Sequence, residues 1–153
     1  YILPQVGHMT DRNYHFYLGW PRGIVWGLFE PDMDPEAVDQ KYRRMMTDVV
    51  NAFGWTYHVV IIDTSEHALM IESELGVTSF PSIAVQRVVG RKPVFHYKGK
   101  LNTPSVIQFV QDVEEGCIDY ASRKTRGAFG SLLAPTSEQI CDANSVYRQR
   151  ART

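Results

Sequence analysis

The chain has 153 residues, of which 44% are hydrophobic and 22% are charged. These proportions are typical of one globular domain whose core needs no disulfide, and they exclude an intrinsically disordered chain. The net charge is −1, and no run approaches the roughly 18 consecutive apolar residues of a membrane span.

Residues 1–13 show no hydrophobic period, and we expect them to form an N-terminal arm. Residues 14–20 are compatible with a short first strand or with an irregular entry to the domain. The nearly continuous apolar run 23–29 predicts a strand that is buried on both faces. Asp34 and Pro35, which follow it, are typical of the start of a helix.

A long helix is predicted from Pro35 to about Phe53, because its apolar residues recur every three or four positions. These residues are Val38, Tyr42, Met45, Met46, Val49 and Phe53. A second buried strand is predicted over residues 56–62, where β-branched residues dominate. A short helix is predicted to follow it and to end at Gly76.

Residues 82–88 and 94–97 predict a hairpin with a turn between them. Thr103 and Pro104 begin a last helix. The order β-α-β-α-β-β-α predicts an α/β protein with a mixed central sheet flanked by helices. We assign the domain to residues 14–118.

The charge of the chain is unevenly distributed. Residues 1–116 hold 10 basic and 14 acidic residues, whereas residues 117–153 hold 6 and 3. We expect residues 119–153 to form a basic C-terminal tail that is either solvated or docked on a partner protein or a larger assembly. This small positive excess does not by itself indicate nucleic-acid binding.

Cys117 and Cys141 are the two cysteines of the chain. They are 24 positions apart without a local pair of histidines, so their spacing does not indicate zinc. One disulfide and two free thiols both fit the sequence. No phosphate-binding glycine loop and no Cys-x-x-Cys motif occurs, so we predict no cofactor and no metal.

The order of elements resembles the thioredoxin fold. The likeness is carried by the strands ending at Phe29 and Asp63 and by the corner 76–82, in which Phe80-Pro81 matches the cis-proline loop of that fold. The stretches 95–99 and 109–116 look most like the protein disulfide isomerases.

Catalytic domains of that family carry Trp-Cys-x-x-Cys just after the first long strand, where this chain has residues 30–35, Glu-Pro-Asp-Met-Asp-Pro. Thiol–disulfide exchange requires a thiolate, which carboxylates and a thioether cannot replace. The resemblance therefore implies the redox-inactive b and b-prime type modules, which bind peptides or partner proteins. We predict no catalytic residue; a less favoured alternative is an enzyme that uses a single cysteine.

In those modules a hydrophobic pocket lies between the first long strand, the long helix and the central strand. The matching residues are Leu28, Met46 and Val60, with Phe80 and Pro81 at the rim. The alternative for Met46 is a plain core position, given its helical spacing. The resemblance implies the lumen of the endoplasmic reticulum; an accessory subunit of a large organellar assembly, for example a mitochondrial one, is the alternative.

Overall fold

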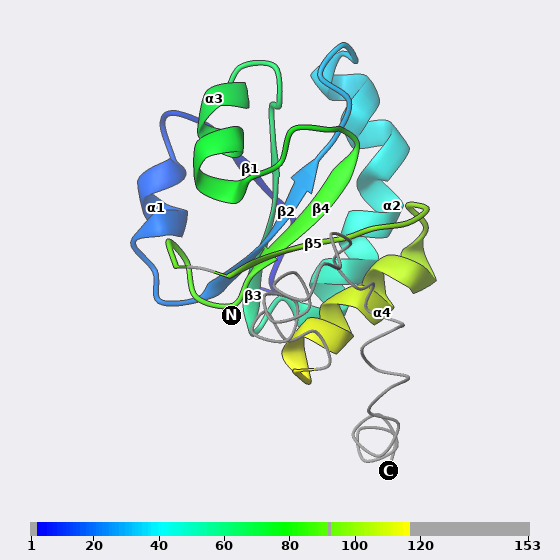
Figure 1. Cartoon of the computed structure of the whole chain (residues 1–153). Coiled ribbons are helices and arrows are strands. Elements are labelled where there is room, and N and C mark those ends of the chain that lie inside the picture. Colours follow the sequence, from blue (N-terminus) through cyan, green and yellow to red (C-terminus); the bar gives the residue numbers. More distant parts are fainter. Residues whose placement is uncertain (1–2, 92, 117–153) are drawn as a thin grey trace, which may run out of the picture.

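The structure, a computed structural model, describes residues 3–91 and 93–116 (Figure 1). Its elements in chain order are β1 (Gly7–Met9), α1 (Tyr14–Leu18), β2 (Gly23–Leu28), α2 (Pro35–Phe53), β3 (Tyr57–Ile62), α3 (Ala68–Met70), the π-helical turn η1 (Ile71–Leu75), β4 (Ser82–Gln86), β5 (Val94–His96) and α4 (Thr103–Glu114). The predicted α/β class is confirmed. No helix of the described residues is long and apolar enough to cross a bilayer.

The five strands form one mixed sheet in the order β1-β3-β2-β4-β5. The first three of these strands are parallel, and β4 and β5 are antiparallel to their neighbours. All six residues of β2 are buried. Trp26 of this strand lies opposite Val60 of β3 and Ala84 of β4. The apolar run of β2 therefore reflects its central place in a sheet that is covered on both faces.

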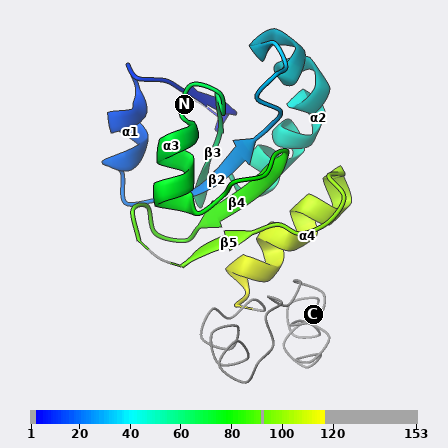
Figure 2. The same cartoon turned by 45° about the horizontal axis from the view of Figure 1, so that its top comes forward.

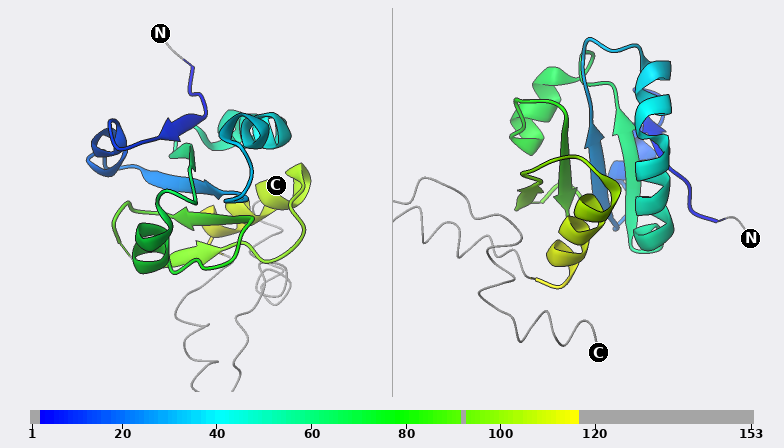
Figure 3. Two further views of the ribbon diagram at one scale, coloured as in Figure 1. Left: turned by 90° about the horizontal axis from the view of Figure 1, so that it is seen from above. Right: turned by 90° about the vertical axis from the view of Figure 1, so that its right-hand side faces the viewer.

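Each face of the sheet carries its own hydrophobic core. α2 and α4 cover one face, and α1 and α3 lie on the other (Figure 3). Successive side chains of a strand point to opposite faces, so Val25 packs in the core beneath α2 and α4 while Trp26 packs in the other core. The alternation along β2 therefore divides its side chains between two separate helical layers.

Two predictions for the N-terminal region are wrong. The expected arm, residues 1–13, contains β1, whose residues Gly7 and Met9 lie opposite Val60 and Ile62 of β3. Residues 14–20, expected to be a strand or irregular, contain α1. A strand of three residues is too short to show an alternating pattern, and α1 buries none of its residues, so it has no apolar period.

The corner 76–81 joins η1 to β4. Gly76 ends η1 with a φ of 71°, a left-handed conformation that favours glycine. The peptide bond between Phe80 and Pro81 is cis. The expected tail, residues 119–153, and both cysteines lie outside the described residues.

The start of α4 provides a test of the fold. The side chain of Asn102 accepts a hydrogen bond of 3.0 Å from the backbone N–H of Ser105. Asn102→Ala removes this cap, and we expect the free energy of unfolding to fall by about 0.5–2 kcal/mol. Urea denaturation measures it. Asn51→Ala, at an exposed position in α2, is the matched control; equal losses in the two variants would contradict the capping role.

Candidate functional site

The structure does not assemble the pocket that the sequence predicted. Leu28, Met46 and Val60 are each 0% exposed. Leu28 and Val60 belong to the core on the α3 side of the sheet, whereas Met46 belongs to the core beneath α2. Phe80 is half-buried against the first of these cores, and Pro81 is exposed. The sequence identified the correct elements, but it did not show which sheet face each side chain occupies.

The segment between β2 and α2 holds an ionised carboxylate. Glu30 accepts a hydrogen bond of 2.8 Å from Lys41 Nζ and another from the Tyr42 hydroxyl. Burial opposes the charge of Glu30, but hydrogen bonds from Lys41 and Tyr42 outweigh it, so the pKa of this carboxyl lies below its usual value. Glu30 therefore ties the end of β2 to the first turns of α2.

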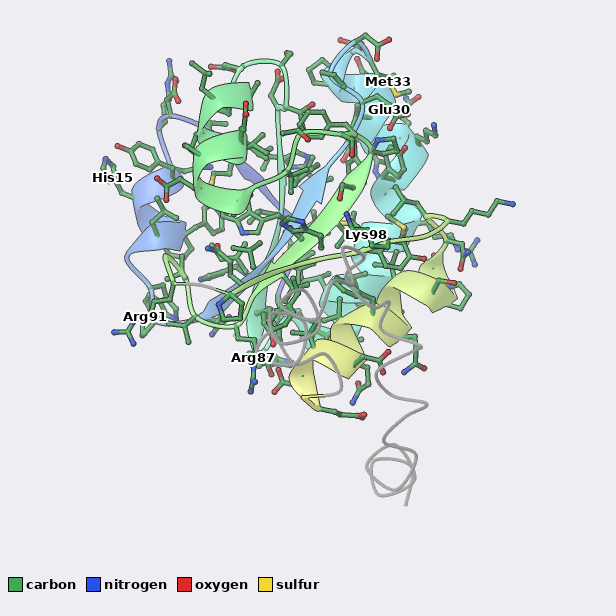
Figure 4. The ribbon with its side chains drawn as sticks, viewed as in Figure 1. His15, Glu30, Met33, Arg87, Arg91 and Lys98 are labelled. Atoms are coloured by element: carbon green, nitrogen blue, oxygen red, sulfur yellow. The ribbon has the colours of Figure 1, made fainter. Side chains whose placement is uncertain are left out.

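A small cavity of about 230 Å³ lies beside this segment. Glu30 and Met33 line it, and Figure 4 shows both residues at the start of α2. Asp39, another lining residue, forms a salt bridge with Arg43, and hydrogen bonding to Arg43 lowers the pKa of its carboxyl. Glu30 and Asp39 are thus both paired with side chains of α2, and none of the residues that line the cavity is a cysteine.

A larger cleft of about 580 Å³ is lined in part by residues of α1, α3 and η1. α1 and α3 lie on the face of the sheet opposite α2 and α4 (Figures 1 and 2). The cleft shares Met9, Thr10 and His67 with the smaller cavity. The lining of the cleft comes from seven of the structural elements and from the loops after β1, before α3 and after β4. The lining residues are Met9, Thr10, Asp11, Tyr14, Leu18, Trp26, Ile62, His67, Met70, Glu74, Leu75, Gln86, Val89 and Gly90. Most of them are apolar, which distinguishes this cleft from the smaller cavity.

Two buried polar side chains of the cleft, Trp26 and Gln86, form a hydrogen bond with each other. Trp26 Nε1 donates a hydrogen bond of 2.9 Å to Gln86 Oε1, and both side chains are buried. Because this pair uses the indole N–H internally, the Trp26 ring contributes apolar surface. Tyr14 and Leu18 of α1 stand on one wall, and Leu18 is 44% exposed.

The cleft exists because the helices on this face are short. α1 has five residues, and α3 with η1 spans Ala68–Leu75. On the other face α2 and α4 have 19 and 12 residues and pack directly against each other. The sequence pattern gives no sign of the cleft, because α1, which forms one of its walls, buries none of its residues.

Asp11, Glu66 and His67 form a group that could hold a metal ion, because their ligand atoms all lie within 4.8 Å of one another. His67 Nε2 is 3.8 Å from Asp11 and 3.9 Å from Glu66. The two carboxylates are exposed to solvent. We assign no metal to this group, since exposed acidic side chains commonly surround a histidine without an ion.

Comparison with known proteins gave matches among solved structures. No protein-family model and no curated protein matches the chain. The bb fragment of ERp72 is 21% identical, with a TM-score of 0.56, over 76% of this chain and 51% of that one. The chain has the thioredoxin fold.

Two further structures support this assignment of the fold. The J-Trx1 fragment of ERdj5 is 12% identical, with a TM-score of 0.53, over 71% of this chain and 50% of that one. Chloroplastic thioredoxin z is 16% identical, with a TM-score of 0.52, over 74% of this chain and 98% of that one. The chain spans about half the length of the ERp72 and ERdj5 fragments. It is similar in fold to domains of protein disulfide isomerase family members.

The burial of Met46 predicts a structural role for its side chain. Met46→Ala should lower the free energy of unfolding by about 2–5 kcal/mol, because it leaves a cavity beneath α2. Met33→Ala, at a half-buried position beside the small cavity, should lower the free energy of unfolding by less than Met46→Ala does. Chemical denaturation of both variants measures the difference. Equal losses of unfolding free energy in the two variants would contradict the structural role of the Met46 side chain.

Proposed function

We propose that this chain is a non-catalytic thioredoxin-fold module that binds peptide segments of other proteins in the cleft between α1 and η1. The observation that carries the proposal is the cleft itself, an apolar hollow of about 580 Å³ walled by partly exposed side chains. Ligand sites typically have volumes of about 300–1,000 Å³ and a mostly apolar lining. The cleft is thus large enough to receive a few side chains of a peptide.

The walls of the cleft suit ligands of varied shape. Met9 and Met70 line it, and methionine side chains are unbranched and adapt to different partners. Leu69 and Val88, the chain neighbours of lining residues Met70 and Val89, are exposed large apolar residues. Exposed apolar side chains thus directly precede two of the lining residues in the chain.

The proposal of a non-catalytic role rests on the segment between β2 and α2. Residues 30–35 contain no cysteine, and Glu30 is engaged with Lys41 and Tyr42. Disulfide exchange needs a thiolate to attack sulfur and a second thiol to release the product. The side chains at this position supply neither, which supports binding without thiol chemistry.

A second candidate function is that of an accessory subunit within a larger assembly. It is favoured by aromatic side chains on α1 and just after it: Phe16 is 58% exposed and Trp20 is 48% exposed, with ring centroids 6.1 Å apart. Exposed aromatic residues often anchor stable protein interfaces. The endoplasmic reticulum lumen is the proposed location of the peptide-binding module, and an organelle such as the mitochondrion that of the subunit.

Leu18→Glu tests the peptide-binding proposal. A charged side chain on the wall of the cleft should weaken binding of a fluorescein-labelled peptide with a central Leu-Phe-Leu about tenfold or more, because burial of one leucine contributes about 1.5–3 kcal/mol. Fluorescence anisotropy measures the affinity. Leu3→Glu, at an exposed leucine outside the cleft, is the control. Equal affinities of the two variants, both still folded, would refute the site.

Insulin reduction tests the absence of thiol chemistry. We expect no turnover by the full chain above the rate with dithiothreitol alone, because residues 30–35, directly after β2, contain no cysteine. Turnover that disappears in Cys117→Ser or Cys141→Ser would contradict the proposal and would favour the single-cysteine enzyme.

A further inference from the structure

The charges that line the cleft are mainly of one sign. Asp11 and Glu74 contribute carboxylates, and no lysine or arginine of the described residues lines the cleft. His67, whose Nε2 atom is 3.8 Å from Asp11, also lines the cleft. The two carboxylates come from different walls, since Asp11 precedes α1 and Glu74 lies in η1.

These carboxylates have few partners within the described part of the chain. No hydrogen bond or salt bridge reaches Glu74 from another described side chain, and His67 is the one described basic side chain within 4.0 Å of the Asp11 carboxylate. Arg91 is a basic residue beside the lining of the cleft in the chain. Arg91 follows the lining residue Gly90, but its side chain points away from the molecule in Figure 4. The negative charge of Asp11 and Glu74 is therefore available to a ligand.

An apolar wall strengthens the effect of such charges. Field lines from a carboxylate are screened less beside a low-dielectric surface than in open water. Lysine and arginine can pack their aliphatic stems on apolar surface while their charged ends reach a carboxylate. Such a side chain could contact the Leu18 and Met70 walls and one carboxylate of the cleft at the same time.

We propose that the cleft selects peptide segments in which an apolar side chain stands next to lysine or arginine, and that it discriminates against acidic segments. The inference rests on the proposed peptide-binding function and adds the chemistry of the preferred segment. The apolar side chain occupies the floor around Trp26, and the basic side chains meet Asp11 and Glu74 on the two walls.

Three labelled peptides test this inference with the full chain. They share a central Leu-Phe-Leu and carry lysine, glutamine or glutamate on both sides of it. We expect the lysine peptide to bind about threefold to tenfold more tightly than the glutamine peptide, since partly exposed ion pairs have modest strength. The glutamate peptide should bind most weakly, and added salt should reduce all these differences.

Glu74→Gln should remove part of the preference for lysine, because it should weaken binding of the lysine peptide more than binding of the glutamine peptide. Glu72→Gln is the matched control, because Glu72 is exposed on the same turn η1 but does not line the cleft. Asp11→Asn should act in the same direction as Glu74→Gln. A preference that survives in both variants would overturn the inference.

The outcomes separate the inference from the proposed function. Equal binding of all three peptides, abolished by Leu18→Glu, would overturn the charge selection and retain the peptide site. Failure of all three peptides to bind would overturn both. An apparent Kd that rises with protein concentration would show that a second copy of the chain competes for the cleft, which would also contradict the inference.

Discussion

The burial of β2 on both faces is the constraint on which the rest of the structure depends. Its six residues are all buried and pair with β3 on one side and with β4 on the other. Because its side chains alternate, the strand must be covered by two helical layers that each supply an apolar face. The chain forms two separate hydrophobic cores, one on each face of the sheet.

The two layers differ in how completely they cover the sheet. α2 and α4 pack against each other and close their side. α1 and α3 are short, and the space left between them is the cleft. The proposed function follows from this difference, because apolar surface that the chain does not cover with its own helices is available to a partner.

The segment on which the proposed absence of thiol chemistry rests and the proposed binding cleft belong to different helical layers of the molecule. Residues 30–35 lie at the start of α2, where Glu30 connects the strand to the helix through Lys41 and Tyr42. The larger cleft is lined by residues from the opposite layer, such as Leu18 and Met70.

The sequence predicted those elements whose periodicity is imposed by burial. The apolar spacing of α2 located its ends at Pro35 and Phe53, and the run in β2 identified a central strand. β1 and α1 were missed, because one has three residues and the other buries none.

The candidate site was missed for a related reason. A cleft depends on which face each side chain occupies and on the gap between two helices, and a linear pattern records neither. Leu28 and Met46 illustrate this, since both are apolar and buried but lie on opposite faces of the sheet.

Mapping of a bound peptide by NMR tests the central claim most directly. The amide shifts of the labelled full chain would be followed during titration with the lysine-flanked Leu-Phe-Leu peptide. The account predicts changes concentrated in α1, α3, η1 and residues 86–90, with little change in α2 and α4. Changes centred on α2, α4 or residues 30–35, with α1 and η1 unaffected, would contradict it.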